Sequence, residues 1–308
     1  MSAKYRICAL TKNKTNPAYV GAQIGAARLA RKLGCTVEGF VPEKPDDIGE
    51  QTAQIHAAIA SKPDAILISP VHATALNGAL QKAVDAGIVL VFFVTSAEGV
   101  DANAFITSDN YTLATGIATR LVEHLGRRGK IAILDGLAQS PTSPPRSEAF
   151  RDVAAAYPGI ELVAAAAGNY QRAEGKAEMA KILAAQPELD GIISANDIMA
   201  LGALEALDEA KRTAAIVGMN AMPDAVKAIK SGRLLATVSY DALSLMAIAL
   251  QAAIRILDGK PVPPVVELPA EIIDRSNCEA WDRPYEERPL PMWEDVMGAD
   301  RESRRKSS

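Results

Sequence analysis

The chain has 308 residues, of which 49% are hydrophobic and 23% are charged, and a formal net charge of −4 at pH 7. This length favours two domains, each large enough to bury a substantial core. The slightly acidic balance argues against a protein that grips phosphate backbones, which would need a basic stripe. No stretch reaches the roughly 18–20 continuous apolar residues of a membrane-spanning helix. The dense basic run at 301–306 is interpreted as a solvated tail.

Short apolar runs alternate with longer amphipathic stretches along almost the whole sequence. Strands are predicted at 5–11, 35–41, 64–70, 88–95, 104–108, 130–136, 160–166, 189–195, 214–220 and 235–241. Helices are predicted between them, including 17–34, 49–62, 113–126 and 243–259. Most of these strands are apolar throughout, which is typical of parallel strands covered on both faces. The alternation predicts an α/β fold with doubly wound parallel sheets.

A faint internal repeat relates residues 60–87 to residues 184–210. Both segments contain the end of a helix, a proline, an aspartate, an apolar strand, a polar turn and a helix with the letters "GAL". The repeat predicts two similar lobes. In such sheets ligands bind beyond the carboxyl ends of the strands, or in the crevice between lobes.

Several predicted strands end in polar residues. In "SANDIMALG" (194–202), Asn196 and Asp197 lie where a buried strand ends and a helix begins. Either side chain could cap the helix, because its oxygens can accept from unpaired backbone N–H groups. The other polar strand ends are "TKNKTNPAY" (11–19), "VTSAEG" (94–99), "MNAMPD" (219–224) and "SYD" (239–241). Because several such ends converge on one sheet edge, we assign Asn196 to a ligand and Asp197 to the helix cap.

The sequence carries no motif of catalysis or cofactor binding. The glycine-rich dinucleotide fingerprint, the P-loop, the nucleophile elbow and the zinc-protease motif are all missing from it. Its three histidines are scattered, and its three cysteines have no metal-like spacing. Cys8 and Cys35 fall in apolar runs and are predicted to be small core residues. We therefore expect no cofactor, no metal site and no enzymatic activity.

A set of individually weak motifs occurs in a specific order and spacing. They are "TNPAYVGAQIGAARLARKLG", "DAILISP", "ITSDN", "PRSEAFRDV", "SANDIMALGALEAL", "IVGMNAMPDAVKAIKSGRLLATV" and "ILDGKPV". Over about residues 5 to 274 the chain resembles the type I periplasmic sugar-binding proteins, the ribose- and galactose-binding class that feeds ATP-driven importers. The resemblance implies two doubly wound, Rossmann-like lobes joined by a three-crossing hinge, which close on the ligand.

The same resemblance implies the domain boundaries. The N-terminal lobe would contain residues 1–108 and 241–268, and the C-terminal lobe residues 109–240 and 269–280. The three crossings would lie near 107–109, 238–241 and 268–271. Residues 281–308 form a Pro-rich extension with spaced tryptophans, which we expect to pack over one lobe.

The resemblance also implies ligand contacts. Asn16 matches a polar contact in the first loop, and Tyr19 matches an aromatic residue that packs on the sugar face. Arg146 matches an arginine that donates to ring and hydroxyl oxygens, and its fixed fork of donors suits adjacent hydroxyls. Tyr170 matches an aromatic wall of the second lobe, and Asn196 matches an amide contact.

Four further site residues depart from the pattern of ribose binders. Val94 and Thr95 stand where those proteins carry an Asp-Arg pair, Asn220 replaces an aspartate, and Tyr240 replaces a glutamine. A hydrogen bond to a charged group contributes about 1.5–3 kcal/mol, against about 1 kcal/mol for a neutral one. With two carboxylates missing, we expect a ligand other than ribose, such as a deoxysugar, a branched or short-chain sugar, or a small polyol.

The function expected from the sequence is that of a solute-binding protein of an ABC-type sugar importer. It would act as a monomer that delivers a small neutral sugar or polyol to a membrane permease, and it would have no nucleic-acid partner. The expected location is the periplasm, with an export signal that is absent from this chain and would have been removed. The alternatives are the effector-binding core of a sugar-responsive repressor without its DNA-binding module, and a chemoreceptor-coupled sugar sensor. An encoded leader or neighbouring transport genes would separate the importer from the repressor.

Overall fold

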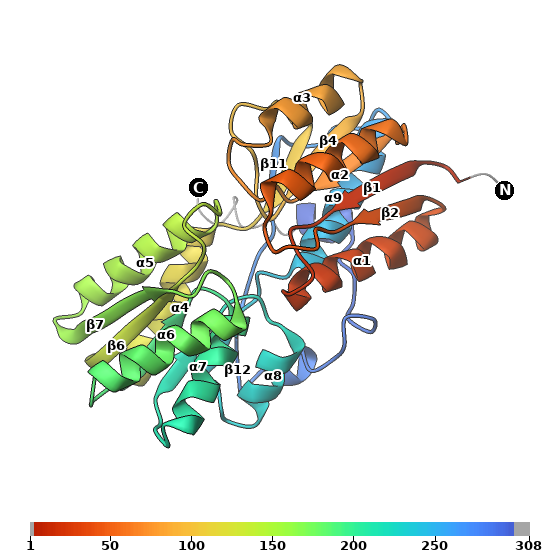
Figure 1. Cartoon of the computed structure of the whole chain (residues 1–308). Helices are drawn as coiled ribbons and strands as arrows, with labels where there is room; N and C mark the ends of the chain where they lie inside the picture. The colour runs from red at the N-terminus through yellow and green to blue at the C-terminus, as the bar shows by residue number, and fades with distance from the viewer. Residues whose placement is uncertain (1–2, 299–308) are drawn as a thin grey trace. The chain divides into compact units, whose positions relative to one another are not determined.

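The computed structural model describes residues 3–298 and divides into two compact units. Unit 1 contains the described residues up to Ser108, Ala242–Pro269 and the described residues from Tyr285 onward. Unit 2 contains Asp109–Asp241 and Ala270–Pro284. In Figure 1, unit 1 therefore combines red and orange elements with blue ones, whereas unit 2 is largely yellow, green and teal. The basic run at 301–306 lies outside the described residues.

Unit 1 is built on a parallel sheet with the strand order β11-β5-β4-β3-β1-β2. Its strands are β1 (Arg6–Leu10), β2 (Thr36–Phe40), β3 (Ala65–Ile68), β4 (Val89–Phe93), β5 (Ala104–Thr107) and β11 (Val265–Glu267). Its helices are α1 (Pro17–Leu33), α2 (Ile48–Ala60), α3 (Asn77–Asp85) and α9 (Ala242–Leu257). Helix α1 packs against α9, and α2 packs against α3. The central strands are fully buried because the helices cover them, which explains why their sequences are apolar throughout.

Unit 2 repeats this design in the strand order β12-β10-β9-β8-β6-β7, with β12 alone antiparallel to its neighbour. Its strands are β6 (Arg128–Asp135), β7 (Gly159–Ala167), β8 (Gly191–Ser194), β9 (Ala215–Val217), β10 (Ala236–Val238) and β12 (Ile272–Asp274). Its helices are α4 (Asn110–His124), α5 (Ser143–Ala156), α6 (Arg172–Ala185), α7 (Asp197–Glu209), α8 (Pro223–Lys230) and the short 3₁₀ helix η1 (Cys278–Ala280). Helices α4 and α5 pack together, as do α6 and α7.

The fold predicted from the sequence is confirmed. The ten predicted strands correspond to β1–β10, and the repeat at 60–87 and 184–210 covers the third strand of each sheet, β3 and β8. Strands β11 and β12 were not predicted, because they lie at the edges of their sheets and each buries only its central residue, so neither shows a buried apolar run. Cys8 and Cys35 are buried as predicted, and burial raises the pKa of both thiols. No helix in residues 3–298 is both long and apolar enough to cross a membrane.

The chain passes between the two units four times within the described residues. Three of these passages follow Ser108, Asp241 and Pro269. Within unit 1, the Ser108 hydroxyl donates to the carbonyl of Leu268 at 2.8 Å, so the first and third passages are hydrogen-bonded neighbours. The fourth passage follows Pro284 and was not predicted.

After the fourth passage, residues 285–297 pack on unit 1, and we name this segment the C-terminal strap. Arg28 on α1 donates from Nη1 to the carbonyls of Tyr285 and Arg288, at 2.7 and 2.9 Å. Gln251 on α9 donates to Pro291 O and accepts from the backbone N–H of Trp293, both at 2.9 Å. The strap is thus held by side chains of unit 1 that bond its backbone, and it is irregular from 285 to 292 and helical from 293.

Candidate functional site

Five of the predicted ligand residues lie along one edge of the unit 2 sheet. Arg146 is on α5, which follows β6, and Tyr170 lies between β7 and α6. Asn196, Asn220 and Tyr240 follow β8, β9 and β10, in that order. These strands are parallel, so their carboxyl ends meet at the same edge. The structure therefore brings together the five residues that the sequence placed in this lobe.

Arg146 is the centre of this cluster. Its side chain is 2% exposed, its Nε donates to Asn110 Oδ1 at 2.9 Å, and its Nη1 donates to the carbonyl of Ala195 at 2.6 Å. The guanidinium carbon lies 4.9 Å from the ring centre of Tyr240 and 5.9 Å from that of Tyr170. The Nη2 atom forms no hydrogen bond with any residue in the described part of the chain. It is therefore free to donate to a ligand.

Asn196 uses only one end of its amide group within the described part of the chain. It is the N-cap of α7, where Oδ1 accepts from the backbone N–H of Met199 at 3.0 Å. Its Nδ2 is fully buried and has no partner among residues 3–298. An unpaired buried donor costs about 1–3 kcal/mol, so it needs a functional reason. Asn196 directly follows Ala195, whose carbonyl accepts from Arg146 Nη1.

The prediction that Asp197 caps α7 is wrong. Asp197 is the first helical residue, and its fully buried carboxylate points to other segments. Its Oδ2 accepts from the backbone N–H of Met222 at 2.9 Å, and its Oδ1 accepts from the Thr237 hydroxyl at 2.7 Å. Asp197 thus ties the start of α8 and strand β10 to α7. The cap belongs to Asn196 because the residue before the first helical turn is the one whose side chain reaches the free N–H groups.

Two residues of the cluster have left-handed backbones. Tyr170 has φ = 59° and Asn220 has φ = 118°, and such conformations cost energy for residues other than glycine. The Tyr170 hydroxyl shares a hydrogen bond of 3.0 Å with the hydroxyl of Thr142, and the ring lies over Gly136, where a Cβ would approach Tyr170 Cζ to 2.2 Å. Asn220 Nδ2 donates to the carbonyl of Tyr240 at 3.2 Å. The two strained backbone positions are therefore those that carry the Tyr170 ring and the Asn220 amide.

The other predicted ligand residues belong to the carboxyl edge of the unit 1 sheet. Asn16 follows β1 and caps α1, with Oδ1 accepting from the backbone N–H of Ala18 at 3.0 Å. The Asn16 N–H itself donates to Asn13 Oδ1 at 2.9 Å. The Nδ2 of Asn16 has no hydrogen-bond partner in residues 3–298. Tyr19, one turn further along α1, is 8% exposed.

Val94 and Thr95 follow β4 in the same unit. Val94 has φ = 65°, and the backbone N–H of Thr95 donates to the carbonyl of Phe93 at 2.7 Å. This is a γ-turn with a positive central φ, a rare and strained form, and it is centred on a β-branched residue. The Thr95 hydroxyl donates to Pro70 O at 2.8 Å and lies 2.9 Å from the Ser69 hydroxyl. Thr95 therefore bonds inside unit 1, whereas Val94 forms the bend of the loop.

Four residues at these edges were missed by the sequence analysis. Lys12 and Asp46 lie in the loops after β1 and β2, and Lys12 is only 2% exposed. Burial raises the pKa of the Asp46 carboxyl above its ordinary value, against the opposing effects of Lys12 and the Asn13 amide. Asn110 and Thr142 each bond a predicted residue. Lys12 falls within the polar strand end at 11–19 and Asn110 ends the motif "ITSDN", so the sequence held a signal for these two residues.

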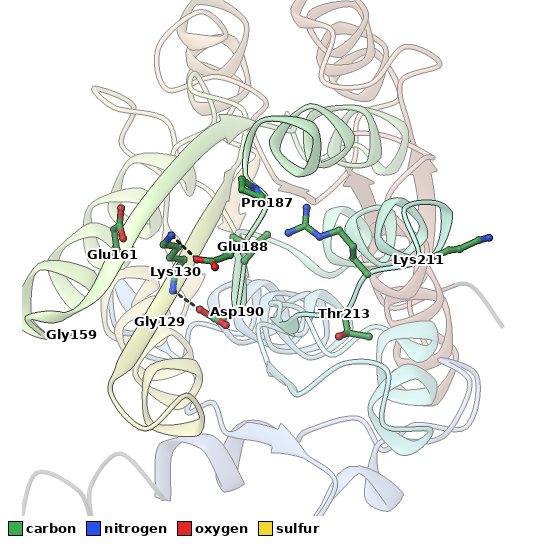
Figure 2. Close-up of a pocket in the computed structure, with 11 residues that line it drawn as sticks. Gly129, Lys130, Gly159, Glu161, Pro187, Glu188, Asp190, Lys211 and Thr213 are labelled. Carbon is green, nitrogen blue, oxygen red and sulfur yellow. Dashed lines mark hydrogen bonds and ion pairs between the residues drawn. The ribbon is translucent and has the colours of Figure 1, made fainter.

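A separate hollow of about 700 Å³ lies at the opposite, amino-terminal edge of the unit 2 sheet (Figure 2). None of the nine predicted ligand residues lines it. Lys130 Nζ is paired with Glu188 at 2.8 Å, and the Lys130 backbone N–H donates to Asp190 at 2.7 Å, as the dashed lines in Figure 2 show. Because none of the predicted ligand residues lines this hollow, the candidate site remains at the carboxyl edge.

The groups offered at the two carboxyl edges are amide nitrogens, one guanidinium nitrogen and tyrosine rings. Amide and guanidinium donors bind hydroxyl and ring oxygens, and an aromatic face packs against the apolar C–H face of a sugar. In residues 3–298, no cluster of three or more histidine, cysteine, aspartate or glutamate residues could hold a metal ion.

Comparison with known proteins agrees with this chemistry. The ribose import binding protein RbsB of Bacillus subtilis (strain 168) is 28% identical over 257 residues, which cover 83% of each chain. The D-apiose import binding protein of Actinobacillus succinogenes is 35% identical over 213 residues, 68% of each chain. A crystal structure of an ABC transporter periplasmic solute-binding protein from A. succinogenes with bound D-allose superposes with a TM-score of 0.86 at 26% identity, covering 90% of this chain and 99% of that one.

The family model of the periplasmic binding protein domain matches residues 7–261, which is most of the chain. The match spans strands from both sheets, and the resemblance inferred from the sequence motifs is confirmed. The chain belongs to the periplasmic binding protein domain family.

Proposed function

We propose that this chain is the solute-binding protein of an ABC-type sugar importer, which binds a small neutral sugar or polyol and delivers it to a membrane permease. The observation that carries the proposal is the buried, unpaired Nδ2 of Asn196, the residue after Ala195, whose carbonyl accepts from Arg146. A ligand hydroxyl would satisfy this donor and recover much of the free energy lost by burying it.

The composition of the site supports a polyhydroxylated ligand. Arg146 has one nitrogen left over after its two protein bonds, and two tyrosine rings flank it. Asn220 uses its Nδ2 on the carbonyl of Tyr240, so its Oδ1 is available as an acceptor for a hydroxyl. Donors and an acceptor between aromatic faces are the groups that orient a sugar ring.

The absence of two carboxylates at predicted ligand positions reduces the range of ligands that we expect. Val94 and Asn220 occupy positions where ribose binders carry aspartates, and a neutral partner gives a weaker hydrogen bond than a charged one. We propose a branched, deoxygenated or short-chain sugar, or a small polyol, in preference to ribose. The relative at 35% identity is named for the import of D-apiose, a name that fits the branched class.

The proposed mechanism is a population shift between an open and a closed form. Asn16 and Tyr19 in unit 1 would bind one side of the ligand, and Arg146, Tyr170, Asn196 and Asn220 in unit 2 the other. A ligand that contacts both units stabilises the closed form by its differential affinity for that form. The permease would recognise the closed form, in the periplasm, and the monomeric protein would release the ligand chemically unchanged.

A calorimetric titration of the ligand-free protein tests this function. The probes are D-apiose, D-ribose, L-rhamnose, xylitol and, as a charged comparison, D-ribonate. We expect saturable 1:1 binding of a neutral probe, with D-apiose or xylitol ahead of D-ribose, and mass spectrometry should recover the probe unaltered. Binding of none of the neutral probes, preference for D-ribonate, or chemical conversion of a bound probe would each overturn the proposal.

A further inference from the structure

Asn110 contacts two of the predicted ligand residues without being one itself. Its Oδ1 accepts from Arg146 Nε at 2.9 Å, and its Nδ2 donates to the Tyr240 hydroxyl at 3.4 Å. It is the first residue of α4, and Asp109 is the N-cap that accepts from the backbone N–H groups of Tyr111 and Thr112. Because Asp109 caps the helix, the Asn110 side chain does not serve as the cap and instead bonds Arg146 and Tyr240.

The direction of the free Arg146 nitrogen depends on Asn110. A guanidinium is planar, so hydrogen bonds from two of its nitrogens fix the direction in which the third nitrogen can donate. One of these bonds goes from Nη1 to the main-chain carbonyl of Ala195, and the other goes from Nε to the Asn110 side chain. The rings of Tyr170 and Tyr240 limit movement out of the plane, but they do not fix rotation within it. Removing the Asn110 acceptor would leave the guanidinium held by one bond.

Asn110 also lies at the hinge segments. It is two residues beyond Ser108, the last residue before the first passage, and Tyr240 immediately precedes Asp241, the last residue before the second passage. Through these two partners, Asn110 joins the arginine to both segments by which the chain changes units.

We propose that Asn110 is a positioning residue for ligand binding: it orients Arg146 and the Tyr240 hydroxyl, and it acts through Arg146. The proposal rests on the proposed function, in which Arg146 is a ligand contact. It adds a residue whose own role is to set the direction of that contact.

The first test needs no ligand. In full-length protein with ¹⁵N-labelled arginine, the Arg146 Nε–H resonance is assigned by its loss in Arg146→Lys, and its exchange with water is measured. We expect a protected Nε–H in the unsubstituted protein and in Asn110→Asp, which keeps an oxygen acceptor. We expect at least tenfold faster exchange in Asn110→Leu, which has a similar size and no acceptor, because a lost hydrogen bond to a charged group is worth about tenfold or more.

The matched control is Asn77→Leu. Asn77 is likewise an asparagine at the first position of a helix, α3, but it belongs to unit 1 and donates to the carbonyl of Glu98. The Asn77→Leu substitution should leave the exchange rate of the Arg146 Nε–H unchanged. If Asn110→Leu does not fold, Asn110→Gln replaces it, because the extra methylene moves the amide away from Nε while the side chain stays polar.

The second test uses calorimetry with D-apiose and D-ribose. Asn110→Leu should weaken the better of the two sugars by about tenfold or more, whereas Asn110→Asp should stay close to the unsubstituted protein. In an Arg146→Gln background, Asn110→Leu should have little additional effect, since residues that act through one another are not additive.

The outcomes separate this proposal from the proposed function. An unsubstituted protein that binds neither sugar counts against the function, and the exchange measurement still decides the positioning role. Unchanged Nε–H exchange in Asn110→Leu overturns the proposal, and so does a loss of affinity that is equally large in the Arg146→Gln background.

Discussion

Asn196 accepts the backbone N–H of Met199 with Oδ1 at 3.0 Å and keeps its Nδ2 buried and unpaired in the described part of the chain. Asn16 has the same arrangement at the start of α1, with Oδ1 on Ala18 and an Nδ2 without a partner among residues 3–298. Capping and ligand binding are therefore not alternatives for these residues. An asparagine can do both, because its amide has an acceptor for the helix and a donor for the ligand.

Asn196→Ser should separate the two functions. Serine caps helices about as well as asparagine, so the thermal midpoint should change little. The substitution removes the Nδ2 donor, so the affinity for the best-binding sugar should fall about tenfold. Calorimetry and thermal unfolding measure the two effects. Asn196→Ala, which lacks both groups, should lower both quantities, and an Asn196→Ser variant with intact affinity would contradict the donor role.

Arg146→Lys should weaken binding strongly although the charge is kept. A lysine has a single nitrogen, which cannot bond Asn110 and Ala195 and also reach a ligand, so we expect an affinity loss of about tenfold to hundredfold. Arg151→Lys is the matched control on the same helix. Arg151 is partly exposed and pairs with Asp135 at 2.7 Å, so its substitution should leave the affinity unchanged. Equal affinities of the two variants in calorimetry would remove Arg146 from the site.

The fold could be predicted from the sequence because its signals are local and repeated. Apolar strands such as β3 and β8 alternate with amphipathic helices, and this pattern defines doubly wound sheets before any contact is known. The three-residue strands β11 and β12 and the fourth passage after Pro284 depend on long-range contacts. No local pattern predicts them.

The site could be predicted as a set of strand ends, but not in its detail. A sequence shows that Asn196 and Asp197 are both plausible caps, and it does not show that the Asp197 carboxylate reaches Met222 and Thr237. Similarly, the support of Arg146 by Asn110 joins residues 36 positions apart. These roles depend on which side chains the packing brings within hydrogen-bond distance.

Val94 provides a test of ligand preference. Val94→Asp adds the carboxylate that ribose binders carry at this position. The affinity for D-ribose should therefore rise relative to the affinities for D-apiose and xylitol. Val94→Gly is the control, because glycine adopts the positive φ of 65° without adding a charge. Calorimetry with the three probes measures the ranking. An unchanged ranking in Val94→Asp would remove the basis for excluding ribose.

Val94→Gly should also change stability. A strained backbone costs about 1–3 kcal/mol, and glycine loses about 0.4–1 kcal/mol through the entropy of the unfolded chain. Val94 is 6% exposed, so glycine also loses about 1.5–3 kcal/mol of side-chain burial. We therefore expect a net loss of about 1 kcal/mol in the free energy of unfolding, measured in urea. A gain of stability would show that the strain of the turn outweighs the contacts of the valine side chain.

Asp46→Asn should change the pH dependence of stability. Burial raises the pKa of the Asp46 carboxyl, so the folded protein holds this proton more tightly than the unfolded chain does. The unsubstituted protein should then lose stability relative to Asp46→Asn as the pH rises from the ordinary value of 3.8 through the raised pKa, and the difference should stay constant above it. Urea unfolding of both proteins across this range measures the difference. The opposite slope would show that attraction to Lys12 outweighs burial.

Gly21→Ala should release the C-terminal strap from unit 1. A Cβ at position 21 would approach the Tyr285 ring to 2.7 Å, so the ring must leave its place on α1. Overpacking of this kind costs about 1–3 kcal/mol, and the better helix propensity of alanine offsets about 1 kcal/mol of it. We expect a change in Trp293 fluorescence and faster tryptic cleavage after Arg288, which is 3% exposed when the strap is in place.

Gly78→Ala is the control for this substitution. Gly78 lies in α3, and a Cβ there meets no atom within 4 Å. It should gain about 1 kcal/mol from helix propensity and leave the strap unaffected. Adding Tyr285→Ala to Gly21→Ala removes the clashing ring, so the cost of the two changes should be smaller than the sum of their separate costs. Strictly additive costs would show that the glycine at position 21 is not required by the tyrosine.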